Sequence, residues 1–404
     1  MKFSLKKIGP GLLFAGAAIG VSHLVQSTKA GADFGFGLIW ALVLVHIFKY
    51  PFFQFGPRYA LATGESLLSG YKKMGKGVLI AYFIITFTTM FTIQTAVTIV
   101  TAGIANTLFG DFISTELWTI IILLISSLIL IKGKFKLLDQ LMKIIVITLT
   151  ISTIAAVILA LNNNSQPLTF TQLLPKNTVE IAFLIAFMGW MPAPLDISVW
   201  QSLWALEKQK TTSDYDVKNS MFDFNVGYFA AIIIGIGFMA LGALVMFQSG
   251  ETFSAKAGEF SNQLITMYTQ SLGSWAYLLI GIAAFTTMFS TTLTTLDASP
   301  RTMAKTTELL FGTTSKHSYL LWIAILICGT IAIFFFLGSE MGLLVQIATI
   351  VSFLTAPFYA IINYKLICSK HTPAEWRPSL KMHVLSWMGI LFLIGFSIWY
   401  LTML

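Results

Sequence analysis

The feature that most constrains this chain is a hydrophobic stretch, residues 11–31, whose middle is unsuited to an ordinary membrane-spanning helix. The stretch reads GLLFAGAAIGVSHLVQSTKAG, and Gly16 and Gly20 loosen its backbone. Polar side chains follow between Ser22 and Thr28, at the depth of the lipid core. Irregular backbone is tolerated at that depth only where it is buried in protein or lines a cavity. We therefore expect a broken helix beside a cavity.

A second hydrophobic stretch, residues 186–201, is interrupted in a similar way. It reads AFMGWMPAPLDISVWQ, and Pro192 and Pro194 remove two amide donors that a regular helix needs. Two interrupted hydrophobic segments in matching halves of a chain are the best sequence indication of a transporter's substrate site. We expect the two breaks to meet near the middle of the membrane.

Composition predicts an all-α integral membrane protein with a single transmembrane domain over residues 1–404. Hydrophobic residues make up 56% of the chain and charged residues 10%. Apolar runs near the length that a bilayer requires predict eleven spans. These are residues 9–30, 36–57, 77–107, 115–132, 138–161, 179–205, 221–248, 273–297, 318–337, 341–364 and 382–403.

The distribution of basic residues predicts the orientation of these spans. Twenty of the 25 Lys and Arg residues fall in loops on one side, which the positive-inside rule makes cytoplasmic. The N-terminus would then be cytoplasmic and the C-terminus outside, in a cell membrane such as a bacterial inner membrane. The two broken spans would run in opposite directions, as an inverted repeat requires, with repeats over residues 9–161 and 179–364 and an added helix over 382–403. The net charge of +8 is explained by topology and gives no support for a nucleic-acid partner.

Several segments resemble the Nramp family of divalent metal transporters. They are GPGLLFAGAAIG at the start, AGADFGFGLIWAL after the first break, LATGES near Gly64, and the pair Met191-Pro192. The resemblance covers nearly the whole chain. It implies the leucine-transporter fold, in which two five-helix repeats are inverted and the first and sixth helices are broken.

The metal-binding residues of that family are mostly replaced here. The family's first break reads Asp-Pro-Gly-Asn, whereas the aligned residues in this chain are 20–23, Gly-Val-Ser-His. In the sixth span the family's Met-Pro-His becomes Met191, Pro192, Ala193, so the thioether remains and the imidazole is lost. The resemblance therefore implies the fold more strongly than it implies a metal substrate.

Other family positions differ as well. The third-span Asp and Glu that the family uses in proton movement fall on Gln94 and Val97, and a tenth-span Gln falls near Thr355. Proton coupling needs titratable groups along a path, and dehydrated Mn²⁺ or Fe²⁺ needs carboxylate or imidazole ligands. Both kinds of group are missing from the expected positions.

The candidate substrate site comprises the polar residues of both breaks and their neighbours. His23 is either a substrate contact or a neutral ring bonded to backbone that the break exposes. Gln26 lies on the same helical face, and Trp190 either walls the cavity or packs in the core. The predicted substrate-binding residues are Gly20, Ser22, His23, Gln26, Trp190, Met191, Ala193 and Thr355.

A stripe of hydroxyl side chains on the eighth span suggests a coupling-ion site. In the leucine-transporter fold a sodium site lies between the first and eighth helices and uses unwound carbonyls and such hydroxyls. The alternative is that small polar residues allow close helix packing. The candidate sodium ligands are Ser290, Thr291, Thr294 and Thr295. Sodium is the only cofactor that the sequence suggests.

Four charged residues, and Met191 in a second possible role, complete the set. Met191 and Asp196 are metal ligands only if the substrate is a metal; otherwise Asp196 stabilises a helix N-terminus. Lys49 lies within the second span and is predicted to extend its amine toward the cytoplasmic surface. Asp297 and Arg301, four residues apart at a helix end, predict a local ion pair.

The sequence predicts secondary transport by alternating access, and it contains no enzyme signature. The leading hypothesis is sodium-coupled uptake of a small anion such as bicarbonate, because the carboxylates are missing while helix N-termini remain. The alternative is a divalent cation, Mg²⁺ or Mn²⁺, as in the family that the chain resembles. A small neutral or zwitterionic solute, or a non-transporting membrane sensor, is also open. The expected partners are an ion substrate and the lipid bilayer, and the sequence indicates no obligatory protein partner.

Overall fold

The computed structural model describes residues 9–404 except 111, 133–134, 164–167, 169, 213–214, 248–251, 313–316 and 338–340. All regular structure in this part of the chain is helical, as the sequence predicts. The elements in chain order are α1 (Pro10–Ala18), the π-helix η2 (Ser22–Ser27), α2 (Thr28–Phe34), α3 (Ile39–Thr63), α4 (Leu67–Met74), α5 (Lys76–Phe109), α6 (Thr115–Lys132), α7 (Phe135–Asn163), α8 (Thr178–Trp190), α9 (Ile197–Thr211), α10 (Val217–Val245), α11 (Ala257–Leu272), α12 (Ala276–Phe311), α13 (Ser318–Leu337), α14 (Met341–Cys368), the 3-10 helix η3 (Ala374–Trp376) and α15 (Leu380–Met403).

Eight helices in the described ranges are long and apolar enough to cross a membrane: α3, α5, α6, α10, α12, α13, α14 and α15. A ninth span is formed by α1 together with η2 and α2, which are bent by 46° at the break between them. The chain is therefore a multi-pass membrane protein. The predicted sixth span is divided into α8 and α9, and α8 alone has 13 residues.

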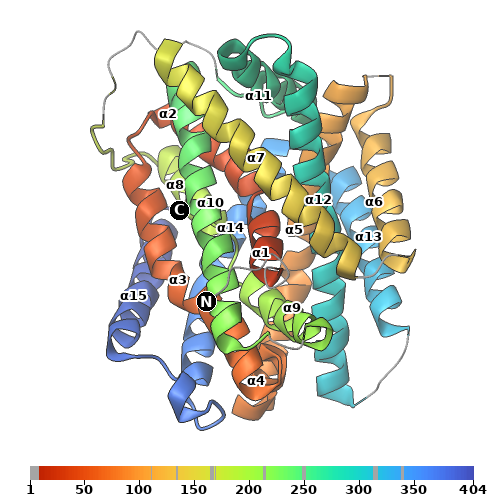
Figure 1. The fold of residues 1–404 in the computed structure, drawn as a ribbon, viewed down its shortest axis with the longest axis vertical. Helices are drawn as coiled ribbons and strands as arrows, with labels where there is room; N and C mark the ends of the chain where they lie inside the picture. Colours follow the sequence, from red (N-terminus) through yellow and green to blue (C-terminus); the bar gives the residue numbers. More distant parts are fainter. Residues whose placement is uncertain are drawn as a thin grey trace.

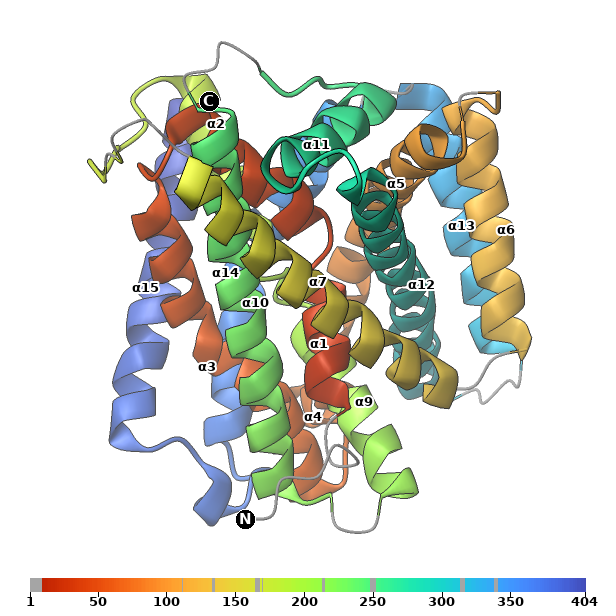
Figure 2. The same ribbon diagram turned by 45° about the horizontal axis from the view of Figure 1, so that its top comes forward.

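The helix α1 lies in the middle of the bundle (Figure 1), where every one of its nine residues is buried. The helices α3 and α15 lie on one side of it, and α6 and α13 lie on the other (Figure 2). Helices α5 and α12 pack extensively against each other between α1 and the α6–α13 edge. A helix at the lipid boundary would expose one face, so the complete burial of α1 places the first break inside protein.

The position of α1 is fixed by close packing against α10 and by a carboxylate. A Cβ atom on Gly227 of α10 would lie 1.9 Å from the carbonyl oxygen of Gly11, so no larger residue fits at this crossing. The buried Asp223 carboxylate accepts hydrogen bonds from the backbone N–H groups of Gly9 and Gly11, at 3.1 and 2.9 Å. It also accepts one from the Tyr215 hydroxyl at 2.8 Å. Asp223 thus does for α1 what an N-cap residue does, but from a distant helix.

The two halves of the other broken span are held by different neighbours. A Cβ atom on Gly189 in α8 would lie 2.1 Å from the Thr349 carbonyl oxygen of α14. A Cβ atom on Gly56 in α3 would lie 2.2 Å from the Ser198 carbonyl oxygen of α9. Because α8 and α9 are fixed by separate helices, the backbone between them is free to leave helical geometry.

The predicted ion pair between Asp297 and Arg301 is confirmed, but it does not lie at a helix end, because α12 continues to Phe311. Arg301 donates from Nη2 to Asp297 Oδ1 at 2.6 Å and from Nε to Oδ2 at 3.1 Å. Tyr319 of α13 donates its hydroxyl proton to the same carboxylate at 2.5 Å. The pair therefore also links α12 to α13.

Candidate substrate-binding site

The first break interrupts the helix between α1 and η2, at residues 19–21. It releases the carbonyl of Ala18, which accepts a hydrogen bond from the Ser22 hydroxyl. The Nδ1 atom of His23 lies 2.9 Å from the same carbonyl and 2.7 Å from the Ser22 oxygen. The chain then resumes as a π-helix, a form that is frequent at functional sites. Side chains from the break itself therefore satisfy the backbone that it exposes.

His23 also ties this break to α10. Its Nε2 atom lies 2.9 Å from the carbonyl oxygen of Ala231, and the ring is completely buried. Gly235, one turn further along α10, faces the ring, and a Cβ there would lie at ordinary contact distance, 3.5 Å, from the imidazole Cδ2. The imidazole thus contacts backbone carbonyls on both sides.

The second break covers residues 191–196, between α8 and α9. Met191 has extended backbone geometry, with φ −86° and ψ 124°. Pro192 and Pro194 have no N–H group, so they cannot donate to the carbonyls that the end of α8 exposes. Asp196 immediately precedes α9 and is buried, and its Oδ1 atom has no hydrogen-bond partner among the described residues. This break therefore supplies few hydrogen-bond donors of its own.

A small cavity of about 20 Å³ lies where the two breaks meet. That volume is about enough for one water molecule or one bare ion. Six helices contribute to its lining, namely α1, η2, α5, α8, α9 and α12, together with residues of both breaks. The lining residues are Ala17, Ala18, Val21, Ser22, Ile93, Val97, Trp190, Ala193, Pro194, Ile197, Trp200, Thr291 and Thr295.

Five of the residues that the sequence predicts for the site line this central cavity: Ser22, Trp190, Ala193, Thr291 and Thr295. The structure brings them together from α8, α12 and both breaks, although up to 273 positions separate them in the chain. The other predicted residues are outside its lining: Gly20, His23, Gln26, Met191, Asp196, Ser290, Thr294 and Thr355.

The residues outside the lining have other contacts. Gly20 packs against Thr291, whose side chain would lie 2.8 Å from a Cβ at that position. The Met191 sulfur accepts a weak hydrogen bond from the Ser27 hydroxyl at 3.8 Å. Thr355 donates to carbonyls of its own helix, at 3.0 and 3.2 Å.

The hydroxyl stripe on α12 is divided between two tasks. Thr291 Oγ1 lies 3.2 Å from the Gly16 carbonyl oxygen of α1 and 3.1 Å from the Thr287 carbonyl oxygen of its own helix. Thr295 donates to Gln94 Oε1 of α5 at 2.8 Å and also lies 3.0 Å from the Thr292 carbonyl oxygen of α12. Ser290 and Thr294 donate to carbonyls of α12, both at 2.8 Å. Only Thr291 and Thr295 of the four candidate sodium ligands therefore face the central cavity, and a sodium site there stays a prediction.

The positions that differ from the expected proton path also lie here. Gln94 donates from Nε2 to Thr98 Oγ1 at 3.1 Å and to the Thr292 carbonyl at 3.3 Å, and it accepts from Thr295. It therefore cross-links α5 to α12 as a neutral group. Val97 places an apolar side chain in the cavity wall.

Trp200 of α9 is a lining residue that the sequence analysis did not select. It is 1% exposed, and its indole N–H has no hydrogen-bond partner among the described residues. A buried indole N–H normally finds an acceptor. The available signal was a Trp one turn into the second half of a broken span.

Lys49 of α3 has a different place from the one predicted. Its side chain does not reach the membrane surface: it is completely buried, and its amine lies among backbone carbonyls at the end of α8 and in the second break. The nitrogen donates to the oxygens of Met188 and Gly189 at 2.7 Å each, of Met191 at 3.0 Å and of Ala193 at 3.3 Å. We call these four carbonyls the carbonyl cage. The prediction was wrong because Lys49 is ten residues from the nearer end of α3, about 15 Å, beyond the reach of its side chain.

Two wider pockets lie toward the two ends of the bundle. One, of about 260 Å³, is lined by residues of η2, α2, α8 and α14, including Gln26, Lys29, Asp33, Glu180 and Gln346. The other, of about 620 Å³, lies between the ends of α3, α9 and α12 near α4. The central cavity shares no lining residue with either of these pockets.

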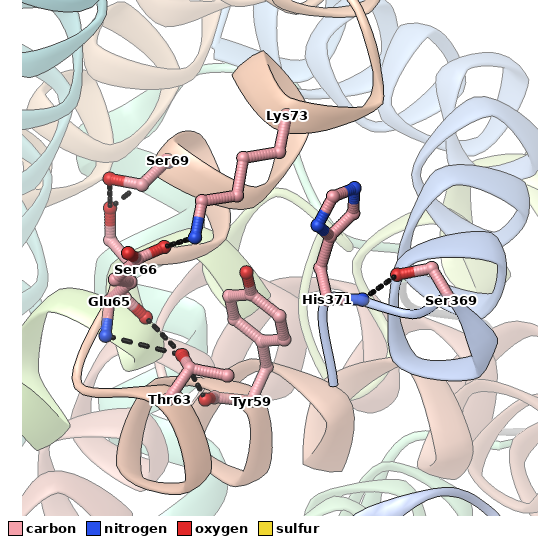
Figure 3. Close-up of polar contacts among 8 residues, drawn as sticks. All are labelled: Tyr59, Thr63, Glu65, Ser66, Ser69, Lys73, Ser369 and His371. Atoms are coloured by element: carbon pink, nitrogen blue, oxygen red, sulfur yellow. Dashed lines mark hydrogen bonds and ion pairs between the residues drawn. The ribbon is translucent and has the colours of Figure 1, made fainter. Parts of the chain in front are cut away.

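Charged and hydroxyl side chains surround the larger pocket. Figure 3 shows the turn after α3, where Lys73 Nζ lies 2.6 Å from Glu65 Oε2 and Ser66 accepts a hydrogen bond from the Ser69 amide. Arg301 and Lys305 of α12 line the same pocket. Such a lining is suited to a water-filled vestibule for a charged solute.

The ligand chemistry of the centre is neutral. None of the described residues that line the central cavity carries a carboxylate, an imidazole or a thiol. No cluster of three or more His, Cys, Asp or Glu side chains that could hold a metal occurs within the described ranges. The polar side chains of the lining are the hydroxyls of Ser22, Thr291 and Thr295 and the indoles of Trp190 and Trp200.

Comparison with known proteins identifies the family. Residues 11–403 match the family described as natural resistance-associated macrophage protein-like, or Nramp. The chain belongs to the Nramp family. It is 36% identical over 401 residues to the uncharacterized protein PM0681 of Pasteurella multocida strain Pm70, a match that covers 98% of this chain and 92% of that protein. The resemblance seen in the sequence is thereby confirmed, and this Nramp protein belongs to a transporter family and not to a family of enzymes.

Solved structures confirm the leucine-transporter-like fold. The manganese transporter of Eremococcus coleocola superimposes with a TM-score of 0.74 at 15% identity, over 96% of this chain and 84% of that one. MhsT, solved in complex with L-phenylalanine, gives a TM-score of 0.64 at 14% identity, over 96% and 98% of the two chains. Since these identities are low and the two proteins bind different solutes, the likeness establishes the fold and leaves the substrate open.

Proposed function

We propose that this Nramp protein is a secondary transporter that carries a small ion by alternating access through the central cavity. The observation that carries the proposal is the small cavity at the meeting point of the two helix breaks, with a wider pocket toward each end. In this fold, one group of helices rocks against the other around a site near the bilayer midplane. Opening the bundle toward either pocket would expose the cavity to one side at a time.

The proposal includes the predicted topology. Eleven spans require that α7 and the pair α8–α9 cross the membrane in addition to the nine spans described above. The repeats would then cover residues 9–161 and 179–364, with α15 as the added helix. The end that carries α4 would face the cytoplasm, because most basic loop residues lie on that side.

A divalent cation is the first substrate class to test. The family match and the shared fold with a manganese transporter support it. Mg²⁺ retains several of its waters when bound, so it would need fewer protein ligands than a dehydrated Mn²⁺, but the cavity of about 20 Å³ would have to widen to admit them. The hydroxyls of Ser22, Thr291 and Thr295 are the oxygen ligands that side chains of the cavity lining can offer.

A small anion is the second candidate, and one observation favours it. The lining has an unused hydrogen-bond donor, the Trp200 indole, while it has no carboxylate among its described residues. An anion such as bicarbonate accepts hydrogen bonds and needs no negative ligand. Sodium would then be the coupling ion, held near Thr291 and Thr295.

Uptake into proteoliposomes tests both candidates. The purified protein is reconstituted, and entry of Mn²⁺, Mg²⁺ and labelled bicarbonate is followed with and without an inward sodium gradient. Saturable metal uptake that does not need sodium would support the cation, and sodium-dependent bicarbonate uptake would support the anion. If the protein binds an ion but moves none of them, the transport proposal fails and a sensor is the better hypothesis.

A further inference from the structure

The environment of the Lys49 amine is unusual for a lysine. Four backbone carbonyl oxygens surround it at 2.7, 2.7, 3.0 and 3.3 Å, and all belong to the end of α8 or to the second break. No side chain of α8 or of the break takes part in these four bonds. A cluster of neutral backbone oxygens around one point is the kind of site that binds monovalent metal cations.

The geometry indicates that Lys49 is charged. An ammonium group has three hydrogens, and three carbonyl oxygens lie within 3.0 Å of the nitrogen to accept them. A neutral amine has only two hydrogens, so its lone pair would point at the third of these oxygens, and the two would repel each other. Hydrogen bonds from a charged donor to carbonyls are also the stronger kind.

Two features of the surroundings compensate this buried charge. The carbonyl cage stands at the C-terminal end of α8, where the helix dipole favours a cation. Asp196, at the other end of the second break, lies within electrostatic range of Lys49, and its Oδ1 atom has no hydrogen-bond partner among the described residues. The charge is therefore balanced across the break without a direct salt bridge in the described structure.

We propose that the carbonyl cage is a monovalent-cation site which the ammonium group of Lys49 fills from within the chain. This inference rests on the proposed function, in that the cage borders the cavity taken as the transport site. It deepens that function by naming the residue that limits which ions the second break accepts. While the ammonium is in place, neither Na⁺, K⁺ nor a divalent metal can be coordinated by the carbonyls of Met188, Gly189 and Met191.

The test replaces the charge and keeps the length of the side chain. In Lys49→Met the stem still fills the space in α3, but the carbonyl cage has no internal cation. We expect the unfolding midpoint of this variant in detergent to rise saturably, by about 2 °C or more, with NaCl or KCl compared with choline chloride at equal ionic strength. The wild type should show no such difference. Lys29→Met is the matched control, because Lys29 is partly exposed in the pocket of about 260 Å³.

Several results would overturn the inference. One is a Lys49→Met midpoint that is equal in sodium, potassium and choline. Another is a wild-type protein that sodium or potassium stabilises to the same degree as the variant. If Lys49→Met does not fold, Lys49→Gln leaves the same carbonyl cage with a shorter, uncharged side chain and is measured in the same salts.

A measurement on the wild type completes the test. Reductive methylation followed by peptide mass spectrometry should modify Lys29 while Lys49 stays unmodified, and equal modification of both would refute the proposed occupancy. The transport proposal fails separately. If no ion is taken up by the wild type while Lys49→Met still gains a cation-dependent midpoint, transport is refuted and the assignment of Lys49 stands.

Discussion

The two helix breaks differ in where their polar groups come from. The first break is followed directly by Ser22 and His23 at the start of η2, and these side chains contact the Ala18 carbonyl that the break exposes. The second break consists of residues 191–196, Met-Pro-Ala-Pro-Leu-Asp, and depends on Lys49 of α3 to satisfy its carbonyls. One break is therefore self-sufficient, whereas the other depends on a group borrowed from a neighbouring helix.

The difference has a mechanical consequence. The contacts within the first break are local, and the Nε2 atom of His23 adds one link to α10. The ammonium group of Lys49 joins α3 to both the end of α8 and the start of the second break. In alternating access the two broken helices move relative to the rest of the bundle, so the second break moves with α3 unless the ammonium leaves its cage.

The largest expected effect comes from removing the amine of Lys49, on which the second break depends. Lys49→Met leaves four buried carbonyls without their donor and the nearby Asp196 without its compensating charge. Loss of one partner from such a buried arrangement costs about 3–5 kcal/mol of unfolding free energy. Thermal unfolding in detergent with choline as the only added cation measures it, with Lys29→Met as the control. If the two variants unfold at similar temperatures, the second break does not depend on Lys49.

The next largest effect is expected at the first break, from the loss of the His23 imidazole. His23→Ala removes the ring between the carbonyls of Ala18 and Ala231, and we expect a loss of about 2–3 kcal/mol. His371→Ala, on a half-buried imidazole after α14, is the control. Hydrogen exchange should also increase in η2 and in the facing turn of α10. A loss larger than that of Lys49→Met would reverse the comparison between the two breaks.

The sequence indicates where the breaks are but not which helices stabilise them. Gly20, Pro192 and Pro194 act on their own backbone, so their effect is local and can be recognised from one sequence. The contact between Lys49 and the end of α8 joins residues about 140 positions apart, and nothing in the local pattern around either one indicates it. Its position far from both ends of α3 could have excluded the surface prediction.

The second limit of the sequence prediction was the direction in which each hydroxyl side chain of the eighth span faces. Helical periodicity placed the hydroxyls of the eighth span on one stripe, yet only Thr291 and Thr295 line the central cavity. Ser290 and Thr294 are buried as well, but they bond within their own helix. A stripe wider than the cavity contains residues of both kinds, and only the packing of α12 against α1 and α5 separates them. The family resemblance was enough to predict the fold, whereas the identity of the substrate depends on which side chains face the cavity.

A third prediction separates the two groups of hydroxyls. Thr291→Val removes the hydroxyl that contacts the first break while it keeps the shape of the side chain. If the central cavity is the substrate site, the apparent affinity for the transported ion should fall about tenfold, or about 1.4 kcal/mol. Thr355→Val, outside the cavity lining, should leave uptake unchanged. Equal effects of both variants would show that the cavity is not where the ion binds.

The smallest expected effect distinguishes an anionic substrate from a cationic one. Trp200→Phe removes an indole N–H that has no partner among the described residues, so it should change the unfolding free energy by less than about 1 kcal/mol. If the ion is an anion that accepts this hydrogen bond, its apparent affinity should weaken about threefold, which corresponds to less than 1 kcal/mol. A cation has no use for the donor and should be transported equally well. Trp204→Phe is a matched control, since its buried N–H also lacks a described partner but does not line the cavity. Uptake that is weakened equally by both variants would mean that α9 acts through packing and that the Trp200 N–H does not select the ion.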